Sequence, residues 1–231
     1  MKKYLFLLLL LPVWVSAQNR QVVEATSGED LSQKVATQMQ YLFPEFTIGD
    51  VFYKGHKGIG KLNYNMLLGE MQFLENDQIK ALANVKDVVV MKIDNRRFYP
   101  FNEKEFTEEL MSTGKYQLRV RRKGNVAQHS KKGAYGMDSS TSAITSYSSI
   151  SSDNRQYDLT VAEKVLITLN NFYYLVGTNG KHILIKNVKT FTKQFPQYRT
   201  QIEEFAKERR IRFDNEGDLK ALLEYCSKLG S

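Results

Sequence analysis

The sequence predicts an α+β protein in which a curved antiparallel β-sheet carries an N-terminal helix and a C-terminal helical cap. Apolar residues alternate with polar ones over much of residues 44–187, which is typical of half-buried strands. Helical spacing of apolar residues is confined to residues 28–42 and 188–231. Strands grouped in one segment and helices in another indicate α+β rather than alternating βαβ units. A sheet that curves into a partial barrel is the alternative arrangement.

Composition excludes several classes of protein. The chain has 231 residues, 33 Lys plus Arg and 25 Asp plus Glu, giving a formal net charge of +8. A hydrophobic content of 42% with four prolines excludes a disordered, collagen-like or proline-rich chain. A single cysteine excludes a disulfide scaffold and a cysteine-built metal site. The length fits one or two domains, and we expect residues 18–43, 44–187 and 188–231 to pack as one.

The first residues have the pattern of an export signal. Two lysines precede an apolar run from Tyr4 to Leu11, and Val15-Ser16-Ala17 supplies small or β-branched residues before Gln18. This predicts a secretory signal peptide over residues 1–17, since a membrane anchor needs about 20 apolar residues. The single cysteine, Cys226, lies far from the position that a lipid anchor requires. We expect cleavage before Gln18, a periplasmic or outer-membrane-associated protein, and no transmembrane segment in the mature chain.

One helix and then a series of strands are expected in the first half. Leu31, Val35, Met39 and Leu42 recur at helical spacing, which predicts a helix over 28–42. Alternation then predicts strands at 48–53, 62–68 and 71–73, with a bulge or bend at Gly69, and a strand at 97–101 after a turn at Asp94-Asn95. The apolar run Val88–Ile93 suggests a central strand covered on both faces. Asn102 and Glu105 are expected to cap a short helix that carries Phe106 and Leu110.

The second half begins with a predicted strand over 116–126 and a serine-rich loop over 129–158. Three further strands are expected at 163–169, 172–176 and 182–186, with turns at Asn170-Asn171 and at 178–180. Helical spacing returns at Val188, Pro196 suits a first turn, and a last helix starts near Asn215. We expect that last helix to bury Cys226 as an unreactive core thiol.

Three groups of residues carry a family resemblance. They are Phe46, Gly49, Val51 and Tyr53, then Leu62-Asn63-Tyr64-Asn65 and Glu70-Met71-Gln72-Phe73, and finally Phe195-Pro196, Ile202, Phe213 and Asp218-Leu219. In these residues the chain resembles a family of uncharacterised exported proteins of Bacteroidota-type bacteria. The resemblance implies a Gram-negative envelope address and supplies no site residues.

Motifs that usually carry catalysis are weak here. Residues 55–61 match the first seven positions of a P-loop, but Leu62 stands where magnesium needs Ser or Thr, so a hairpin turn is expected. His56, His129 and His182 lack the spacing of a metal site. The serine-rich loop lacks the Gly-x-Ser-x-Gly motif of a hydrolase. We therefore predict no catalytic residues, no metal and no cofactor.

A run of basic residues without intervening acids is the most specific feature. Its members are Lys115, Arg119, Arg121, Arg122, Lys123, Lys131 and Lys132. Such a cluster attracts anions, which in the envelope are lipid head groups, acidic polysaccharide or an acidic protein. The interpretation that we favour is a solvated strand face that resists edge-to-edge pairing, with anion binding as the alternative. Export makes nucleic acid an unsuitable partner.

These observations favour a non-catalytic envelope protein that acts as a binding or interaction module, with the basic strand face as the candidate site for an anionic component or partner protein. One alternative is a periplasmic carrier of a lipid-like or apolar ligand, held where a partial barrel is closed by a helix. A hydrolase of envelope glycans or peptides is the other alternative.

Overall fold

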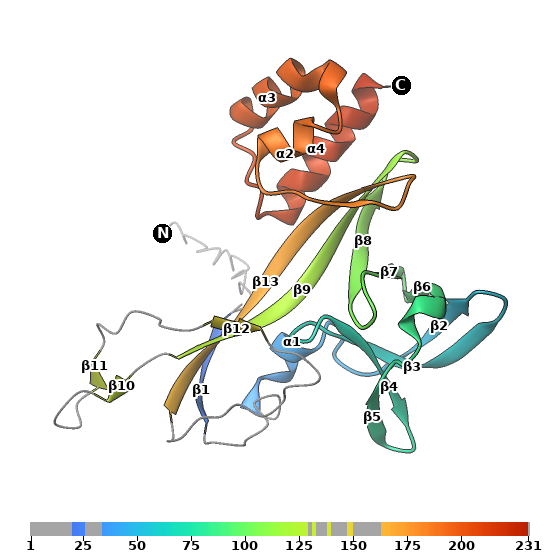
Figure 1. The fold of residues 1–231 in the computed structure, drawn as a ribbon, viewed down its shortest axis with the longest axis vertical. Coiled ribbons are helices and arrows are strands. Elements are labelled where there is room, and N and C mark those ends of the chain that lie inside the picture. The colour runs from blue at the N-terminus through green and yellow to red at the C-terminus, as the bar shows by residue number, and fades with distance from the viewer. Residues whose placement is uncertain are drawn as a thin grey trace, which may run out of the picture.

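The computed structural model describes residues 20–25, 34–128, 131–132, 138–139, 147–149 and 163–230. It contains a 12-stranded antiparallel sheet, a separate two-stranded pair and three C-terminal helices, α2 (Val188–Thr192), α3 (Arg199–Glu208) and α4 (Glu216–Leu229), gathered at one end (Figure 1). This confirms the helix-plus-sheet architecture. The predicted signal peptide and most of the serine-rich segment lie outside the described residues.

Strand order follows the chain only in part: β1-β13-β9-β8-β7-β6-β2-β3-β4-β5, with β12 on β9 and β14 on β13. Because β1 and β5 form the two ends of this order, the described sheet is open and not a barrel. The strands are β1 (Arg20–Ala25), β2 (Thr47–Tyr53), β3 (Lys57–Asn65), β4 (Glu70–Glu75), β5 (Gln78–Ala81), β6 (Val88–Ile93), β7 (Arg96–Pro100), β8 (Phe106–Ser112), β9 (Tyr116–Gln128), β10 (Lys131–Lys132), β11 (Asp138–Ser139), β12 (Tyr147–Ser149), β13 (Glu163–Gly177) and β14 (His182–Leu184).

One hydrophobic core lies under the strands of the first half. Alternation directs Val51, Leu62 and Met91 inward, where Tyr64 and Phe98 pack with ring centroids 5.3 Å apart. The predicted strands at 48–53 and 71–73 are confirmed within β2 and β4, and β6 has the extent of the apolar run Val88–Ile93. The strand predicted at 62–68 is confirmed only as far as Asn65, because residues 66–69 form the turn before β4. The prediction that β6 is covered on both faces is wrong, because Lys92 is exposed and Val89, at a bulge, is 51% exposed.

The segment after Asn102 forms a strand and not the predicted helix. Phe106 and Thr107 are fully buried in β8, which pairs with β7 on one side and β9 on the other. Asn102 keeps a capping role, since its Oδ1 accepts from the amides of Lys104 and Glu105, but it closes a turn. Pairing on both sides outweighs the local helix signal.

The expected turn at Asn170-Asn171 is also absent from the structure. Both residues lie within the continuous strand β13, where Asn170 pairs with Lys123 and Asn171 with Arg122. The long strand β9 offers a partner along this whole length, so turn-forming residues stay extended. The turn at 178–180 is confirmed, with Gly180 at φ +73°.

The predicted N-terminal helix is represented only by α1 (Thr37–Gln40). It ends because Tyr41 is extended and bridges Asn65 beside β3, so Leu42 is not helical. Part of the predicted helix lies outside the described residues and stays a prediction.

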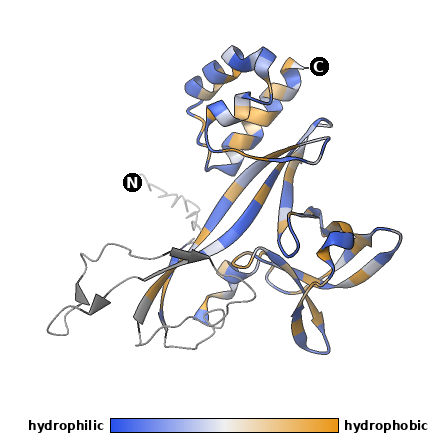
Figure 2. Ribbon diagram, viewed as in Figure 1, coloured by the Kyte–Doolittle hydropathy of each residue, from blue (hydrophilic) through white to orange (hydrophobic). Residues whose placement is uncertain are grey.

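A second hydrophobic core joins one end of the β9–β13 ribbon to the C-terminal helices. These are α2 (Val188–Thr192), α3 (Arg199–Glu208) and α4 (Glu216–Leu229), with 3₁₀ turns η2 (Val85–Asp87) in the sheet region and η3 (Pro196–Tyr198) before α3. The sequence predictions hold here: Asn215 caps α4, whose buried side includes Leu219 and Cys226. Against this side pack Leu118 of β9 and Leu175 of β13, and apolar bands alternate with polar ones along both strands (Figure 2).

Candidate functional site

Strand β9 places the predicted basic residues on both of its faces. Alternation puts Arg119, Arg121 and Lys123 on one face and Arg122 on the other. Lys115 lies in the turn before β9, and Lys131 and Lys132 form β10, whose side chains lie outside the described structure. Because β9 pairs with both β8 and β13, the interpretation of this face as protection of a sheet edge is wrong.

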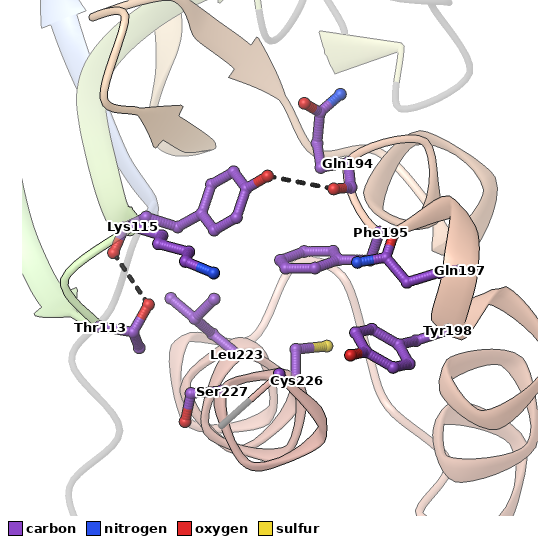
Figure 3. A pocket seen from close by; sticks show the side chains of 11 residues that line it. Thr113, Lys115, Gln194, Phe195, Gln197, Tyr198, Leu223, Cys226 and Ser227 are labelled. Atoms are coloured by element: carbon purple, nitrogen blue, oxygen red, sulfur yellow. Dashed lines mark hydrogen bonds between the residues drawn. The ribbon is translucent and has the colours of Figure 1, made fainter.

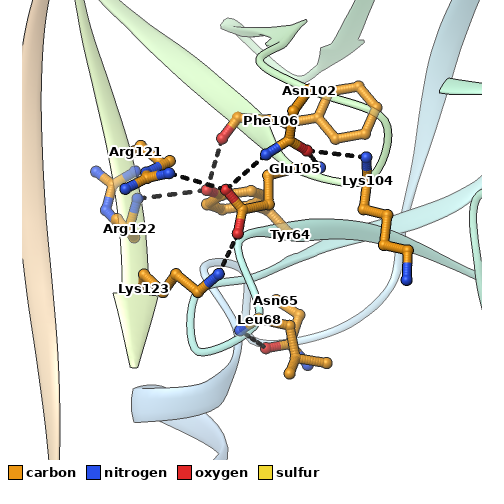
Figure 4. Close-up of polar contacts among 10 residues, drawn as sticks. All are labelled: Tyr64, Asn65, Leu68, Asn102, Lys104, Glu105, Phe106, Arg121, Arg122 and Lys123. Carbon is orange, nitrogen blue, oxygen red and sulfur yellow. Dashed lines mark hydrogen bonds and ion pairs between the residues drawn. The ribbon is translucent and has the colours of Figure 1, made fainter. Parts of the chain in front are cut away.

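Glu105 gathers two of these cations (Figure 4). Its Oε2 accepts from Arg121 Nη1 at 3.0 Å and its Oε1 accepts from the Lys123 ammonium. Asn102 Nδ2 donates to the same carboxylate at 3.1 Å. The Glu105 side chain is only 10% exposed, so the three donors compensate a carboxylate that is largely removed from water.

Glu108 likewise accepts from two cations, on the opposite face of the β8–β9 pair. Its carboxylate, 3% exposed, accepts from Arg122 Nη1 and from Arg96 Nη1, the latter at 2.7 Å. Beside it the Tyr64 hydroxyl donates to the Phe106 carbonyl at 3.0 Å (Figure 4). Burial raises the pKa of Tyr64, although the Arg122 guanidinium opposes this. Tyr64 is therefore a neutral hydrogen-bond donor within the core.

Arg119 is held by uncharged groups and a more distant acid. It donates from Nε to Gln117 Oε1 at 2.9 Å, and its guanidinium lies 3.8 Å from the centroid of the Tyr99 ring. The Tyr99 hydroxyl in turn donates to Glu109 at 3.0 Å. Burial lowers the pKa of Arg119, which Tyr99 and Glu109 counteract.

An aromatic cluster covers the same face of the ribbon. The Arg121 guanidinium lies 4.7 Å from the Phe101 ring centroid and 5.0 Å from that of Phe172. The His182 ring stands edge-on to Phe101 at 5.1 Å and to Tyr174 at 5.9 Å. Burial, and then the positive charge of Arg119, lowers the pKa of His182. Its imidazole is therefore held in the neutral form among aromatic rings.

The structure thus divides the predicted anion-binding set. Arg119, Arg121, Arg122 and Lys123 are brought together, but mainly against acids of β8 and the turn before it. Glu105 is shared by Arg121 and Lys123, and Glu108 by Arg122 and Arg96, so each cluster keeps one positive charge in excess beside a buried carboxylate. Anion binding by the seven-residue set stays a prediction.

The other motifs occupy ordinary structural positions. Residues 55–61 run through the β2–β3 turn, with Gly55 at φ +104°, and continue into a strand; the hairpin prediction is confirmed. His56 stacks on Tyr53 at 4.5 Å, whereas His129 lies outside the described residues. Within the described ranges, no group of three His, Cys, Asp or Glu side chains could hold a metal ion.

A surface that sequence reasoning missed lies on the outer face of the first-half sheet. Register aligns Ile48 of β2 with Lys61 of β3, then with Leu74 of β4 and Ile79 of β5, in one row across four strands. Ile48 is 68% exposed and Ile79 is 51% exposed. Large apolar side chains this open are in a poor position to stabilise the fold.

The adjoining rows of this surface supply more apolar area and positive charge. Ile59, 70% exposed, pairs with Asp50, which pairs on its other side with Lys92. In the next row Phe52 has the ammonium groups of Lys57 and Lys92 at 5.5 and 5.0 Å from its ring. We call this surface the outer face; it consists of Ile48, Asp50, Phe52, Lys57, Ile59, Lys61, Leu74, Ile79, Val90 and Lys92. Sequence reasoning missed this surface because it placed Lys57 and Ile59 in a hairpin turn and expected no strand at Ile79.

Local charge on the outer face is positive. Asp50 forms an ion pair with Lys57 at 2.9 Å. In the described structure, neither Lys61 nor Lys92 has a carboxylate within ion-pair distance. The outer face is therefore both apolar and cationic.

Comparisons with protein-family models, with curated proteins and with solved structures found no match. The envelope family that the sequence resembles therefore stays a prediction. Among the helices in the described part of the chain, none has the length and apolar character needed to cross a membrane.

Proposed function

We propose that this chain is a non-catalytic binding module of the cell envelope that docks reversibly on an anionic lipid surface through the outer face. The observation that carries the proposal is the exposure of Ile48 and Ile59, at 68% and 70%, among the lysines of the same sheet face. Export and a periplasmic or outer-membrane-associated address are part of the proposal.

Lipid head groups suit this surface for two reasons. Lysines that lie among apolar residues pair with phosphates, while the isoleucines reach the boundary between head groups and acyl chains. The apolar and charged residues share one sheet face, which favours a broad, planar partner over a projecting segment. Asp50 reduces the charge of the face, so binding depends on both kinds of contact.

The expected strength is that of a reversible interaction. Each lysine near an anionic surface contributes about 1 kcal/mol. Each isoleucine that leaves water only in part contributes about 1–2 kcal/mol. Only a few residues contribute these terms, and the entropic cost of immobilising the protein on the lipid surface opposes them.

Vesicle co-sedimentation tests the proposal. The purified protein should sediment with vesicles that contain phosphatidylglycerol and should remain in the supernatant with phosphatidylcholine alone. Replacing both isoleucines, I48S with I59S, should lower the binding constant by about thirtyfold or more, and K61Q with K92Q should lower it by about thirtyfold. Binding should also weaken as salt rises from 0.1 to about 0.5 M, because screening acts on the lysines.

Matched controls separate the outer face from general charge and hydrophobicity. V22S removes an exposed apolar side chain on β1, where Val22 is 45% exposed, and K189Q with K193Q removes two exposed cations near α2. Neither should change vesicle binding. Equal binding to both kinds of vesicle, or equal losses in the controls and the outer-face variants, contradicts the proposal. If the chain bound an acidic protein and not the vesicles, the acidic protein would replace the lipid surface as its partner.

A further inference from the structure

A pocket lies at the opposite end of the molecule from the outer face, where the β8–β9 turn meets the C-terminal helices (Figure 3). Its volume of about 330 Å³ falls at the lower end of the range for small-molecule sites, roughly 300–1,000 Å³. Three segments line it: residues 113–116 of the turn, residues 194–198 before α3, and the last turns of α4. It is not the barrel mouth that the carrier alternative required.

Its walls are apolar and held in place. Phe195, Tyr198 and Leu223 line the pocket, and the Tyr116 ring packs on Phe195 with centroids 4.8 Å apart. The Tyr116 hydroxyl donates to the Gln194 carbonyl at 3.1 Å, which ties the turn to the helical segment (Figure 3). Phe195 is itself stacked on buried Phe191. The cavity is therefore preformed by the second hydrophobic core.

A single positive charge points into this cavity. The Lys115 ammonium reaches toward Phe195 and Cys226 (Figure 3). Among the described residues, no carboxylate lies within ion-pair distance of Lys115. By contrast, Arg121 and Lys123 pair with Glu105, and Arg122 pairs with Glu108. The Cys226 thiol adds no charge, because burial raises its pKa to about 12.

The described polar atoms of the rim can accept or donate hydrogen bonds without adding charge. They belong to Thr113, Gln197, Ser227 and the Tyr198 hydroxyl, which points toward the pocket interior (Figure 3). An apolar cavity with one cation and neutral polar groups at its edge matches a ligand with one anionic end and an apolar body.

We propose that this pocket binds a small amphipathic anion, with its carboxylate on Lys115 and its apolar body against Phe195, Tyr198 and Leu223. The site is separate from the outer face and independent of the proposed docking on lipid. It assigns a role to Lys115, which forms no ion pair with a described carboxylate.

Calorimetric titration with decanoate, below its micelle-forming concentration, tests the proposal. Decanol and decyltrimethylammonium have the same chain with a neutral and a cationic end. The protein should bind decanoate more tightly than either by about tenfold, the difference expected for one charge-assisted contact. K115Q should remove this preference, and K181Q, an exposed lysine in the β13–β14 turn, should leave it unchanged.

NMR locates the site and separates it from non-specific uptake. Decanoate should shift the Leu223 methyl and Cys226 amide resonances and leave those of Ile48 and Ile59 unchanged. K115Q should retain the circular dichroism of the parent, because Lys115 is exposed. No decanoate binding, equal affinity for the three probes, or unchanged binding by K115Q overturns the proposal, whatever the outcome of vesicle docking.

Discussion

Arg121 of β9 donates to Glu105, the residue directly before β8, at 3.0 Å, and so joins the ribbon to the first-half sheet through a carboxylate that is only 10% exposed. Lys123 donates to the other oxygen of the same carboxylate. One acid is therefore shared by two cations on β9, whose side chains are only 19% and 17% exposed.

We predict that E105Q lowers the free energy of unfolding by about 2–4 kcal/mol, because Arg121 and Lys123 would remain partly buried without a carboxylate. Urea denaturation measures the change. The control is E103Q, two residues away in the same turn and exposed, which should change stability by less than about 0.5 kcal/mol. If E105Q left the free energy of unfolding unchanged, Arg121 and Lys123 would be hydrated in the variant without loss of stability.

Gly49 and Gly60 face one another across β2 and β3, yet their surroundings differ. A Cβ at Gly49 would lie 2.7 Å from the Lys92 carbonyl oxygen and 3.0 Å from atoms of Ile93 and Leu62. At Gly60 the nearest atom, of Leu62, would lie 3.8 Å away, which is ordinary contact.

We therefore predict that G49A destabilises the protein by about 1–3 kcal/mol and that G60A is neutral or slightly stabilising. Thermal unfolding of the two variants under identical conditions is the measurement. Equal losses would show that β2 shifts away from β6 with little cost.

Much of the fold could be predicted from periodicity. The two-residue alternation located β2, β3 and β9, and Asn215 with the apolar stripe after it located α4. Such signals are local, since a strand's own sequence carries its inward and outward positions. The same property allowed Cys226 to be assigned to the core.

Features that depend on a distant partner could not be predicted in this way. Asn170-Asn171 stay extended only because β9 runs alongside, and Phe106 is in a strand because β7 and β9 flank it. The basic run gave no sign that Glu105 and Glu108 would be its partners. Alternation revealed which residues face outward, but the alignment of Ile48 with Ile79 required the register of four strands.

His182 should make stability depend on pH. Burial and Arg119 lower the pKa of His182 in the folded protein, so the unfolded chain takes up a proton first as the pH falls. The contribution of neutral His182 is present above the unfolded pKa of about 6.5 and is lost as the pH falls through the lower folded pKa.

We predict that the parent loses more stability than H182Q between pH 7.5 and pH 5, whereas the two curves run parallel above pH 7.5. Urea midpoints across this range measure the difference. H56Q, at an exposed histidine of the β2–β3 turn, controls for loss of a histidine elsewhere. Parallel curves for parent and H182Q over the whole range would contradict the assignment.

The thiol of Cys226 should be almost unreactive in the folded protein. It is 3% exposed, and burial raises its pKa to about 12, so little thiolate forms at pH 8. Ellman's reagent should therefore label the native protein slowly and the protein in 6 M guanidinium chloride rapidly. L222A, which opens the same core, should speed native labelling by lowering the free energy of unfolding by about 2–5 kcal/mol, whereas A221S on the exposed side of α4 should not. Because the chain has one cysteine, the labelled fraction reports on this helix alone. Rapid labelling of the native parent would show that α4 separates readily from the ribbon and that the second core is less tightly packed than its burial indicates.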